Sequence, residues 1–228
     1  MIATRQAGSV WTPKMPGDEV FYAPLWRPDL GVSPFKSLDR NGHVCTVTEA
    51  GWGYQGYTFD GTNDKITIPN HAALVTATDK MTVIGWVKPT AIDQAGGIFT
   101  LDDVNTNHKG YNLYAYLDEK FYFDLRTTAD KQCIAPTTFS AGNWYLAAGV
   151  YDGQNITAYS GTPTTAPTAG TPVATTGNFV TTSADSTIGV YASTFLEAVI
   201  GEIVVYRGRY LTLAELTAYW QTSKWRYS

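Results

Sequence analysis

Charged side chains are scarce in this 228-residue chain. They make up 16% of the residues, compared with roughly 25% in an average soluble domain. The net charge is -4 at pH 7, and the sequence has no stripe of basic residues that could release counterions from a phosphate backbone. We therefore expect no nucleic-acid partner.

Cysteine is also scarce. The two cysteines, Cys45 and Cys133, lie far apart in the sequence and suggest no disulfide framework. A chain of this length buries roughly 70% of the surface that its unfolded form exposes, so it needs neither a disulfide nor a metal for stability. We predict that both thiols are free.

Long apolar runs are absent. No stretch approaches the roughly 18 apolar residues of a membrane span, so we expect no membrane partner. Residues 1–9 contain no apolar run of signal-peptide length. The localisation stays open between a protein made in the cytoplasm or carried in a virion-type particle, and an extracellular protein whose leader has been removed.

Catalytic motifs are missing as well. The sequence has no Gly-x-Ser-x-Gly elbow, no His-Glu-x-x-His and no phosphate loop. The letters of Gly51–Gly56 match a dinucleotide-binding pattern, but strand-like residues follow them instead of a helix, so we predict a glycine-rich turn. Glu202 stands alone, whereas glycoside hydrolysis normally needs two carboxyl groups. We expect a protein that is not an enzyme, with its three histidines in solvent: His43, His71 and His108.

Aromatic residues are plentiful, at 14% of the chain, with 15 Tyr and 7 Trp. Runs of alternating apolar residues recur about every ten residues with turn residues between them, which is typical of a two-sheet sandwich. The Pro- and Thr-rich segment 161–177 is predicted to be an extended surface loop. The predicted strands lie near 19–26, 44–48, 56–59, 65–68, 81–88, 96–101, 110–117, 120–126, 143–151 and 154–160.

One helix is predicted near the C-terminal end of the sequence. Thr212 and Glu215 have the spacing of a capping box, in which each side chain satisfies a backbone N–H of the first turn. Leu213, Leu216 and Trp220 follow at i, i+3 and i+7, so they form an apolar stripe that we expect to pack on the sandwich.

Four stretches occur in an order that carries a family resemblance: Phe59–Ile68, Met81–Pro89, Gly142–Gly153 and Ile200–Tyr206. This order resembles the laminin-G-like and pentraxin-like branch of the concanavalin A-like lectin and glucanase superfamily. The resemblance implies an all-β fold, a two-sheet antiparallel β-sandwich of jelly-roll type with one short C-terminal helix. That fold hosts sugar binders, enzymes and adhesion modules, so the function must be argued from a site.

The resemblance covers nearly the whole chain. We therefore predict an N-terminal arm, residues 1–19, followed by a single laminin-G-like domain, residues 20–228.

A calcium site is a further expectation. Asp103, Asn105 and Asn107 place oxygen side chains at alternate positions, as in loops that bind hard cations. The resemblance to pentraxins implies calcium at this loop, together with an acidic cluster near residues 190–192. The sequence has no carboxylate there and so supplies half of such a site. The alternative is an ordinary loop tip, because Asp and Asn favour turns for backbone reasons.

The best recognition surface comes from the predicted hairpin 110–126. Strand alternation places one set of its residues on the face away from the core. Tyrosine rings stack on sugar rings, and carboxylate, amide and guanidinium groups bind hydroxyls. In the alternative interpretation, cross-strand aromatic pairs only stabilise an exposed sheet. The predicted ligand-binding residues are Asn112, Tyr114, Tyr116, Tyr122, Asp124 and Arg126.

Three functions remain open at this point. The first is a non-catalytic, lectin-like module that binds a glycan or cell-surface polysaccharide. The second is a structural or decoration domain of a phage or virion-type assembly, with other subunits as partners. The third is a polysaccharide hydrolase whose carboxylate pair includes Asp124.

Overall fold

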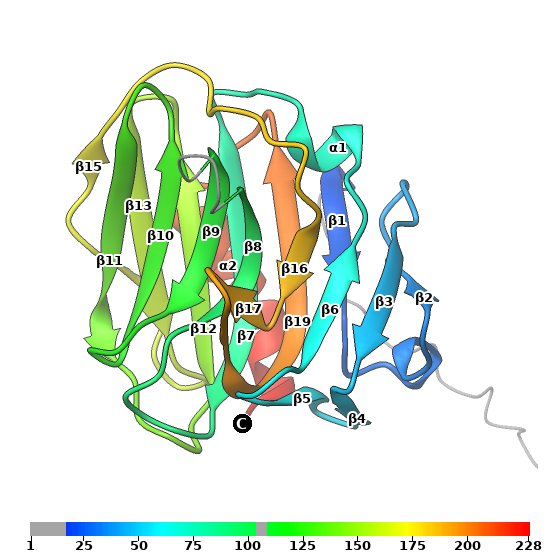
Figure 1. Ribbon diagram of the computed structural model, residues 1–228. Coiled ribbons are helices and arrows are strands. Elements are labelled where there is room, and N and C mark those ends of the chain that lie inside the picture. Colours follow the sequence, from blue (N-terminus) through cyan, green and yellow to red (C-terminus); the bar gives the residue numbers. More distant parts are fainter. Residues whose placement is uncertain (1–16, 104–108) are drawn as a thin grey trace, which may run out of the picture.

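The computed structural model describes residues 17–103 and 109–228. Two antiparallel sheets face each other in a sandwich, and a short helix, α2 (Leu213–Ser223), lies near the C-terminal end (Figure 1). The predicted all-β sandwich is therefore confirmed. The 1–19 arm and 20–228 domain boundaries stay a prediction, and residues 1–16 lie outside the described part.

The first sheet has nine strands in the described part of the chain. Two of them lie off the main path, because β1 pairs with β19 and β15 pairs with β13. The main path runs in the order β14 (Thr168–Ala169), β13 (Asn155–Gly161), β12 (Tyr145–Tyr151), β7 (Met81–Pro89), β19 (Glu197–Arg207), β5 (Gly56–Asp60) and β4 (Gly51–Gly53), with β1 at Glu19–Ala23 and β15 at Val173–Ala174.

The second sheet has eight strands within the same described residues. Its order is β11 (Asp130–Thr138), β10 (Lys120–Arg126), β9 (Lys109–Ala115), β8 (Gly96–Asp103), β16 (Ser186–Ile188), β6 (Lys65–Ile68), β3 (Val44–Thr48) and β2 (Phe35–Lys36). A small hairpin of β17 (Val190–Tyr191) and β18 (Thr194–Phe195) follows β16. The remaining short helical elements are α1 (Ala72–Val75), η1 (Pro28–Leu30) and η2 (Lys224–Arg226).

The main core fills the space between the sheets. Alternation along β10 sends Phe121, Phe123 and Leu125 inward, where they are buried in one apolar cluster. A Cβ at Gly149 of β12 would clash with the ring of Phe123 at its Cδ2 atom, so glycine is required at this contact between the layers. The residues that alternate with these along the strand point to the outer face of the second sheet.

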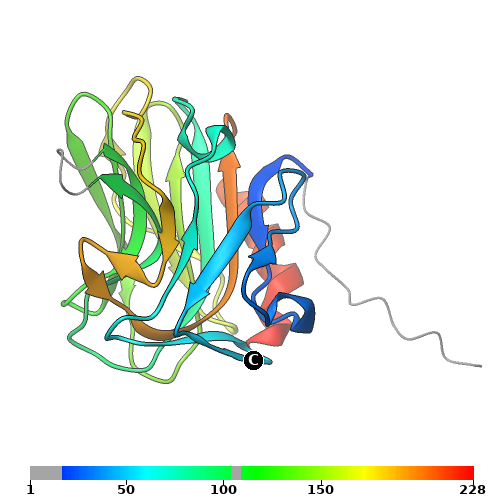
Figure 2. The same ribbon diagram turned by 45° about the vertical axis from the view of Figure 1, so that its right-hand side comes forward.

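The helix α2 covers the outer face of the first sheet, on the side away from the second sheet (Figures 1 and 2). The predicted capping box is present, with both reciprocal hydrogen bonds between Thr212 and Glu215. Leu216 and Trp220 are buried, as expected, but Leu213 is 47% exposed. The prediction for Leu213 was wrong, because this first residue of the helix lies at the edge of the buried contact between α2 and the sheet. Tyr219 is buried in that contact instead.

Other expectations meet mixed outcomes. Cys45 and Cys133 are free and buried, as predicted. Of the three histidines expected in solvent, His71 is exposed and His108 lies outside the described residues. His43 is buried instead, with its Nε2 2.9 Å from the Val20 carbonyl oxygen. The segment 161–177 is not wholly a loop, since β14 and β15 pair with β13. None of the helices in residues 17–103 and 109–228 is long and apolar enough to cross a membrane.

Candidate functional site

The outer face of the second sheet carries an aromatic row beside a polar row. Strand register sets these rows, because directly paired residues point to the same face. In the polar row, Asn112 of β9 lies opposite Asp124 of β10, and Asp124 lies opposite Gln132 of β11. In the aromatic row, Tyr114 lies opposite Tyr122. The predicted alternation of the hairpin is therefore correct.

The β17–β18 hairpin lies over this face (Figure 1). Its backbone can approach the sheet because β8 carries glycine at position 97: a Cβ there would clash with the Val190 carbonyl oxygen. Both residues of the hairpin turn, Ala192 and Ser193, have positive φ, which a two-residue turn of this kind requires. The hairpin places the ring of Tyr191 above the aromatic row.

Tyr114 is covered by this hairpin. The ring of Tyr191 stacks on it with centroids 4.0 Å apart and planes inclined by 10°, and Tyr122 stacks on it at 5.4 Å. Tyr114 is consequently 1% exposed. The expectation that Tyr114 is displayed at the surface was wrong, because a segment distant in sequence occupies the space above it.

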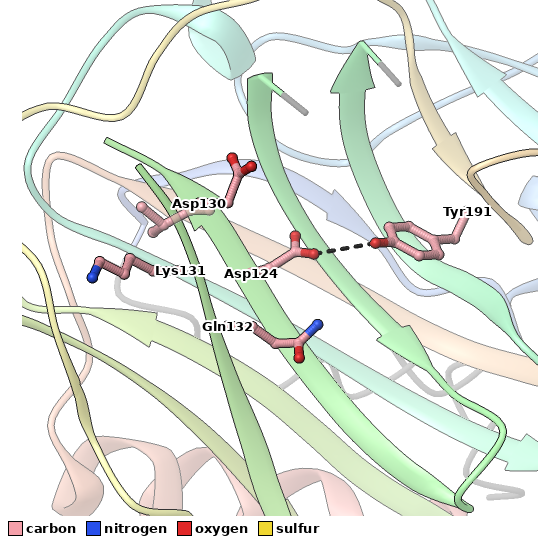
Figure 3. Close-up of a pocket in the computed structure, with 6 residues that line it drawn as sticks. Asp124, Asp130, Lys131, Gln132 and Tyr191 are labelled. Carbon is pink, nitrogen blue, oxygen red and sulfur yellow. Dashed lines mark hydrogen bonds between the residues drawn. The ribbon is translucent and has the colours of Figure 1, made fainter. Parts of the chain in front are cut away.

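Asp124 is the centre of a hydrogen-bond network on the polar row. The side-chain amide of Asn112 donates to Asp124 Oδ1 at 2.9 Å and to Asp102 Oδ2 at 3.1 Å. The Tyr191 hydroxyl donates to Asp124 Oδ2 at 3.3 Å (Figure 3). These donors fix the orientation of the carboxylate.

A pocket of about 240 Å³ opens beside this network. In Figure 3 the Asp124 carboxylate and the Tyr191 hydroxyl point toward one another, while Lys131 points away from them. Gln132 lies on the adjacent strand and donates from Nε2 to the Tyr114 hydroxyl at 2.5 Å. The pocket thus offers an amide and a carboxylate next to an aromatic wall. Its lining residues are Asp124, Leu125, Asp130, Lys131, Gln132 and Tyr191.

The phenols around the pocket stay protonated over a wide pH range. Burial raises the pKa of Tyr114 and of Tyr191, and the nearby Asp124 charge adds to both effects. Burial and the hydrogen bond to Asp118 raise the pKa of Tyr122 to about 12. At neutral pH these hydroxyls therefore act as neutral donors and acceptors.

The six predicted ligand-binding residues do share one face, but their accessibility differs. Tyr116 is 40% exposed and Asp124 is half-buried, whereas Asn112 and Tyr122 are buried like Tyr114. Arg126 is half-buried and its Nη1 lies 3.4 Å from Asp130 Oδ1. Tyr116 is thus the accessible aromatic ring of the predicted set, and Asp124 is the pocket-lining acid among them.

The predicted calcium loop stays a prediction, because most of it lies outside the described residues. Among them, no group of three or more His, Cys, Asp or Glu side chains is placed to hold a metal. Asp103 ends β8, whereas Asn105 and Asn107 lie outside the described residues. The loop half of the predicted site is therefore untested. The segment that the resemblance assigns to the acidic cluster forms the Tyr191 hairpin instead.

Sequence reasoning missed Tyr191 and Gln132. Tyr191 is 67 residues from its partner Asp124 in sequence, and Gln132 belongs to β11, whose pattern did not predict a strand. Gly96 and Gly97, inside the predicted strand 96–101, could have indicated that another segment packs on this strand, because glycine in a strand often marks the close approach of another backbone. A Cβ at either glycine would clash with the backbone of the segment 190–196.

Comparison with known proteins identifies the family. The family model described as the concanavalin A-like lectin/glucanases superfamily, of laminin-G type, matches residues 60–217. The chain belongs to this superfamily. No curated protein sequence matches the chain.

Solved structures show the same fold at low identity. The binding domain of paraclostridial mosquitocidal protein 1 is 11% identical with a TM-score of 0.66, covering 89% of this chain and 52% of that one. A sialidase of Trypanosoma rangeli, solved with sialic acid, is 14% identical with a TM-score of 0.60, covering 90% of this chain and 33% of that one.

A third similar structure matches along its whole length. It is domain 4 of AbnA, an extracellular arabinanase from Geobacillus stearothermophilus, solved with arabinotriose. It is 16% identical with a TM-score of 0.60, and the match covers 89% of this chain and 98% of that one. This chain therefore spans about half of the mosquitocidal binding domain and a third of the sialidase, but nearly all of the arabinanase domain.

Proposed function

We propose that the outer face of the second sheet binds a glycan without cleaving it. The observation that carries this proposal is the Asp124 carboxylate, held by Asn112 and Tyr191 at the edge of a pocket beside a tyrosine cluster. Pre-oriented acceptors suit sugar hydroxyls, and Tyr116 offers an accessible ring for stacking on a sugar. The arabinotriose complex of the similar arabinanase domain is in keeping with a sugar ligand.

The absence of catalysis is part of the proposal. Glycoside hydrolysis needs one carboxyl that is protonated and a second that is not. Both acids of the pocket accept hydrogen bonds from side chains, Asp124 from Asn112 and Tyr191, and Asp130 from Arg126. Each carboxylate is therefore engaged by side chains of the protein, and the two are not presented together as an acid and a nucleophile.

A glycan array, screened with and without calcium, is the first test. We expect binding to at least one polysaccharide class, unchanged by removal of calcium. Glycan binding that requires calcium would instead support the predicted calcium site at the Asp103 loop. Failure to bind any glycan, together with recovery of the protein in assembled particles, would favour the decoration domain.

Single-residue variants then test whether the outer face of the second sheet is the glycan-binding site. Tyr116→Ala should weaken binding about two- to twelvefold, from the roughly 0.5–1.5 kcal/mol of an aromatic contact. Tyr210→Ala is a matched control, since Tyr210 is 37% exposed and lies outside this face. Asp124→Asn should also weaken binding. In a separate assay on the unmodified chain, the release of new reducing ends from the bound polysaccharide would identify a hydrolase.

A further inference from the structure

A second aromatic pocket lies at the opposite layer of the sandwich, between the β4–β5 hairpin and the C-terminal η2 helix. Both views place these two segments side by side (Figures 1 and 2). The pocket has a volume of about 240 Å³ and is lined by Trp26, Tyr54, Gln55, Trp225, Arg226 and Tyr227. The Gly51–Gly56 motif thus forms a hairpin turn, as predicted, and presents Tyr54 and Gln55 to this pocket.

The aromatic rings of this pocket are held in fixed orientations. The Trp26 indole N–H donates to Glu202 Oε2 at 3.2 Å, and the Trp225 indole N–H donates to the Thr222 carbonyl oxygen at 2.9 Å. Because each N–H edge is held by an acceptor of the protein, the ring faces are pre-oriented for a ligand. Trp225 is nevertheless 56% exposed and Tyr54 is 84% exposed, which is unusual for side chains of this size.

A guanidinium group lies between the two indoles. Arg226 stacks over Trp26 at 4.3 Å and over Trp225 at 4.8 Å, and its Nη1 lies 3.3 Å from Glu202 Oε2. The side chain of Arg226 is 5% exposed, so the buried ion pair fixes it as part of the pocket wall. The guanidinium on the pocket wall disfavours a cationic ligand such as a quaternary ammonium, despite the aromatic lining.

The rim of the pocket is polar. Gln55 lines it, and its Oε1 accepts a hydrogen bond from Lys88 Nζ at 2.9 Å, which leaves the amide N–H₂ group as a donor toward a ligand. We propose that this pocket is a second carbohydrate site that takes one neutral or acidic pyranose ring. The ring stacks between Tyr54 and Trp225, and its hydroxyl or carboxylate oxygens accept hydrogen bonds from Gln55. This site is independent of the one on the second sheet.

The test is an NMR titration of the full chain that follows the indole N–H resonances, assigned with Trp26→Phe and Trp225→Phe. The probes are methyl glucoside, sodium glucuronate and, as a cation, choline chloride. We expect both sugars to shift the two indole resonances and choline to shift neither. Tyr54→Ala should weaken the sugar response about tenfold, and because Tyr54 is so exposed the variant should keep its fold.

Tyr116→Ala is the control that separates the two sites. It should leave the indole response unchanged, and Tyr54→Ala should leave binding at the second sheet unchanged. The proposal is overturned if the sugars shift neither indole, if Tyr54→Ala responds like the unmodified chain, or if choline shifts the indoles when the sugars do not.

Discussion

Replacing Gly97 by alanine tests how the hairpin that carries Tyr191 is held on the sheet. A Cβ at this position would come closer to the Val190 carbonyl oxygen than the 3.0 Å below which Cβ contacts essentially never occur. Because the atom that it meets belongs to the backbone, no side-chain rotation can relieve the clash. The β17–β18 hairpin must therefore lift away from β8.

The cost follows from the contacts that the lifted hairpin loses. The Gly189 N–H donates to the Gly97 carbonyl oxygen at 2.8 Å, and Thr100 Oγ1 donates to the Val190 carbonyl oxygen at 2.8 Å. Each such bond contributes about 0.5–1.5 kcal/mol, and the stacked Tyr191 ring contributes a similar amount. We expect Gly97→Ala to lower the free energy of unfolding by roughly 2–4 kcal/mol, or the melting temperature by roughly 5–15 °C.

Thermal unfolding followed by circular dichroism measures the effect, and limited chymotrypsin digestion reports whether Tyr191 becomes accessible. Gly51→Ala is the matched control, because a Cβ at that strand position meets nothing within 4 Å. The control should stay within about 0.5 kcal/mol of the unmodified chain. If Gly97→Ala unfolds at the same temperature, resists chymotrypsin equally and binds glycan equally, the account of the hairpin is wrong.

Three further predictions concern stability and reactivity. Arg226→Met should cost about 3–5 kcal/mol at pH 7, because Glu202 stays buried without its cation. Burial raises the pKa of Glu202, and Arg226 lowers it, so removing Arg226 raises the pKa of Glu202 in the folded chain further. The variant should therefore lose stability as the pH rises from about 4.3, the pKa of Glu in the unfolded chain, toward the folded-state pKa, and recover on acidification. An equal loss in urea unfolding at pH 5 and pH 7 would contradict this. Thr212→Ala should cost about 1 kcal/mol through the loss of the cap on Glu215, measured by thermal unfolding, and an unchanged melting temperature would exclude a role for the cap. Cys45, buried with a pKa raised by burial to about 12, should react with a thiol reagent only after denaturation, so rapid labelling of the folded chain would refute its burial.

Local patterns predicted much of the fold. The alternation in 110–126 gave the correct outward face, and the Thr212–Glu215 spacing gave the correct helix start, because both features are decided by neighbours in sequence. The strand β11 was missed, since Pro136 and several polar residues interrupt its apolar pattern.

The candidate site was predicted only in part. The rows on β9 and β10 follow from strand register, but the cover over Tyr114 comes from Tyr191, whose partner Asp124 is 67 residues away in sequence. Composition and periodicity describe one strand at a time, and they do not say which distant segment packs on an outer face. The same reason hid the contact of Trp26 with Glu202, which are 176 residues apart.

The strand β11 ends the order of the second sheet, and edge strands of this kind can recruit a strand from another molecule. Its pairing with β10 contains an irregularity between Tyr122 and Lys120, and Pro136 lies within the β11 segment opposite it. Proline has no N–H to offer an incoming strand, and the neighbouring Thr137 N–H donates to Ser160 Oγ of the first sheet at 3.3 Å. The β11 edge therefore presents an interrupted row of donors, which discourages edge-to-edge aggregation.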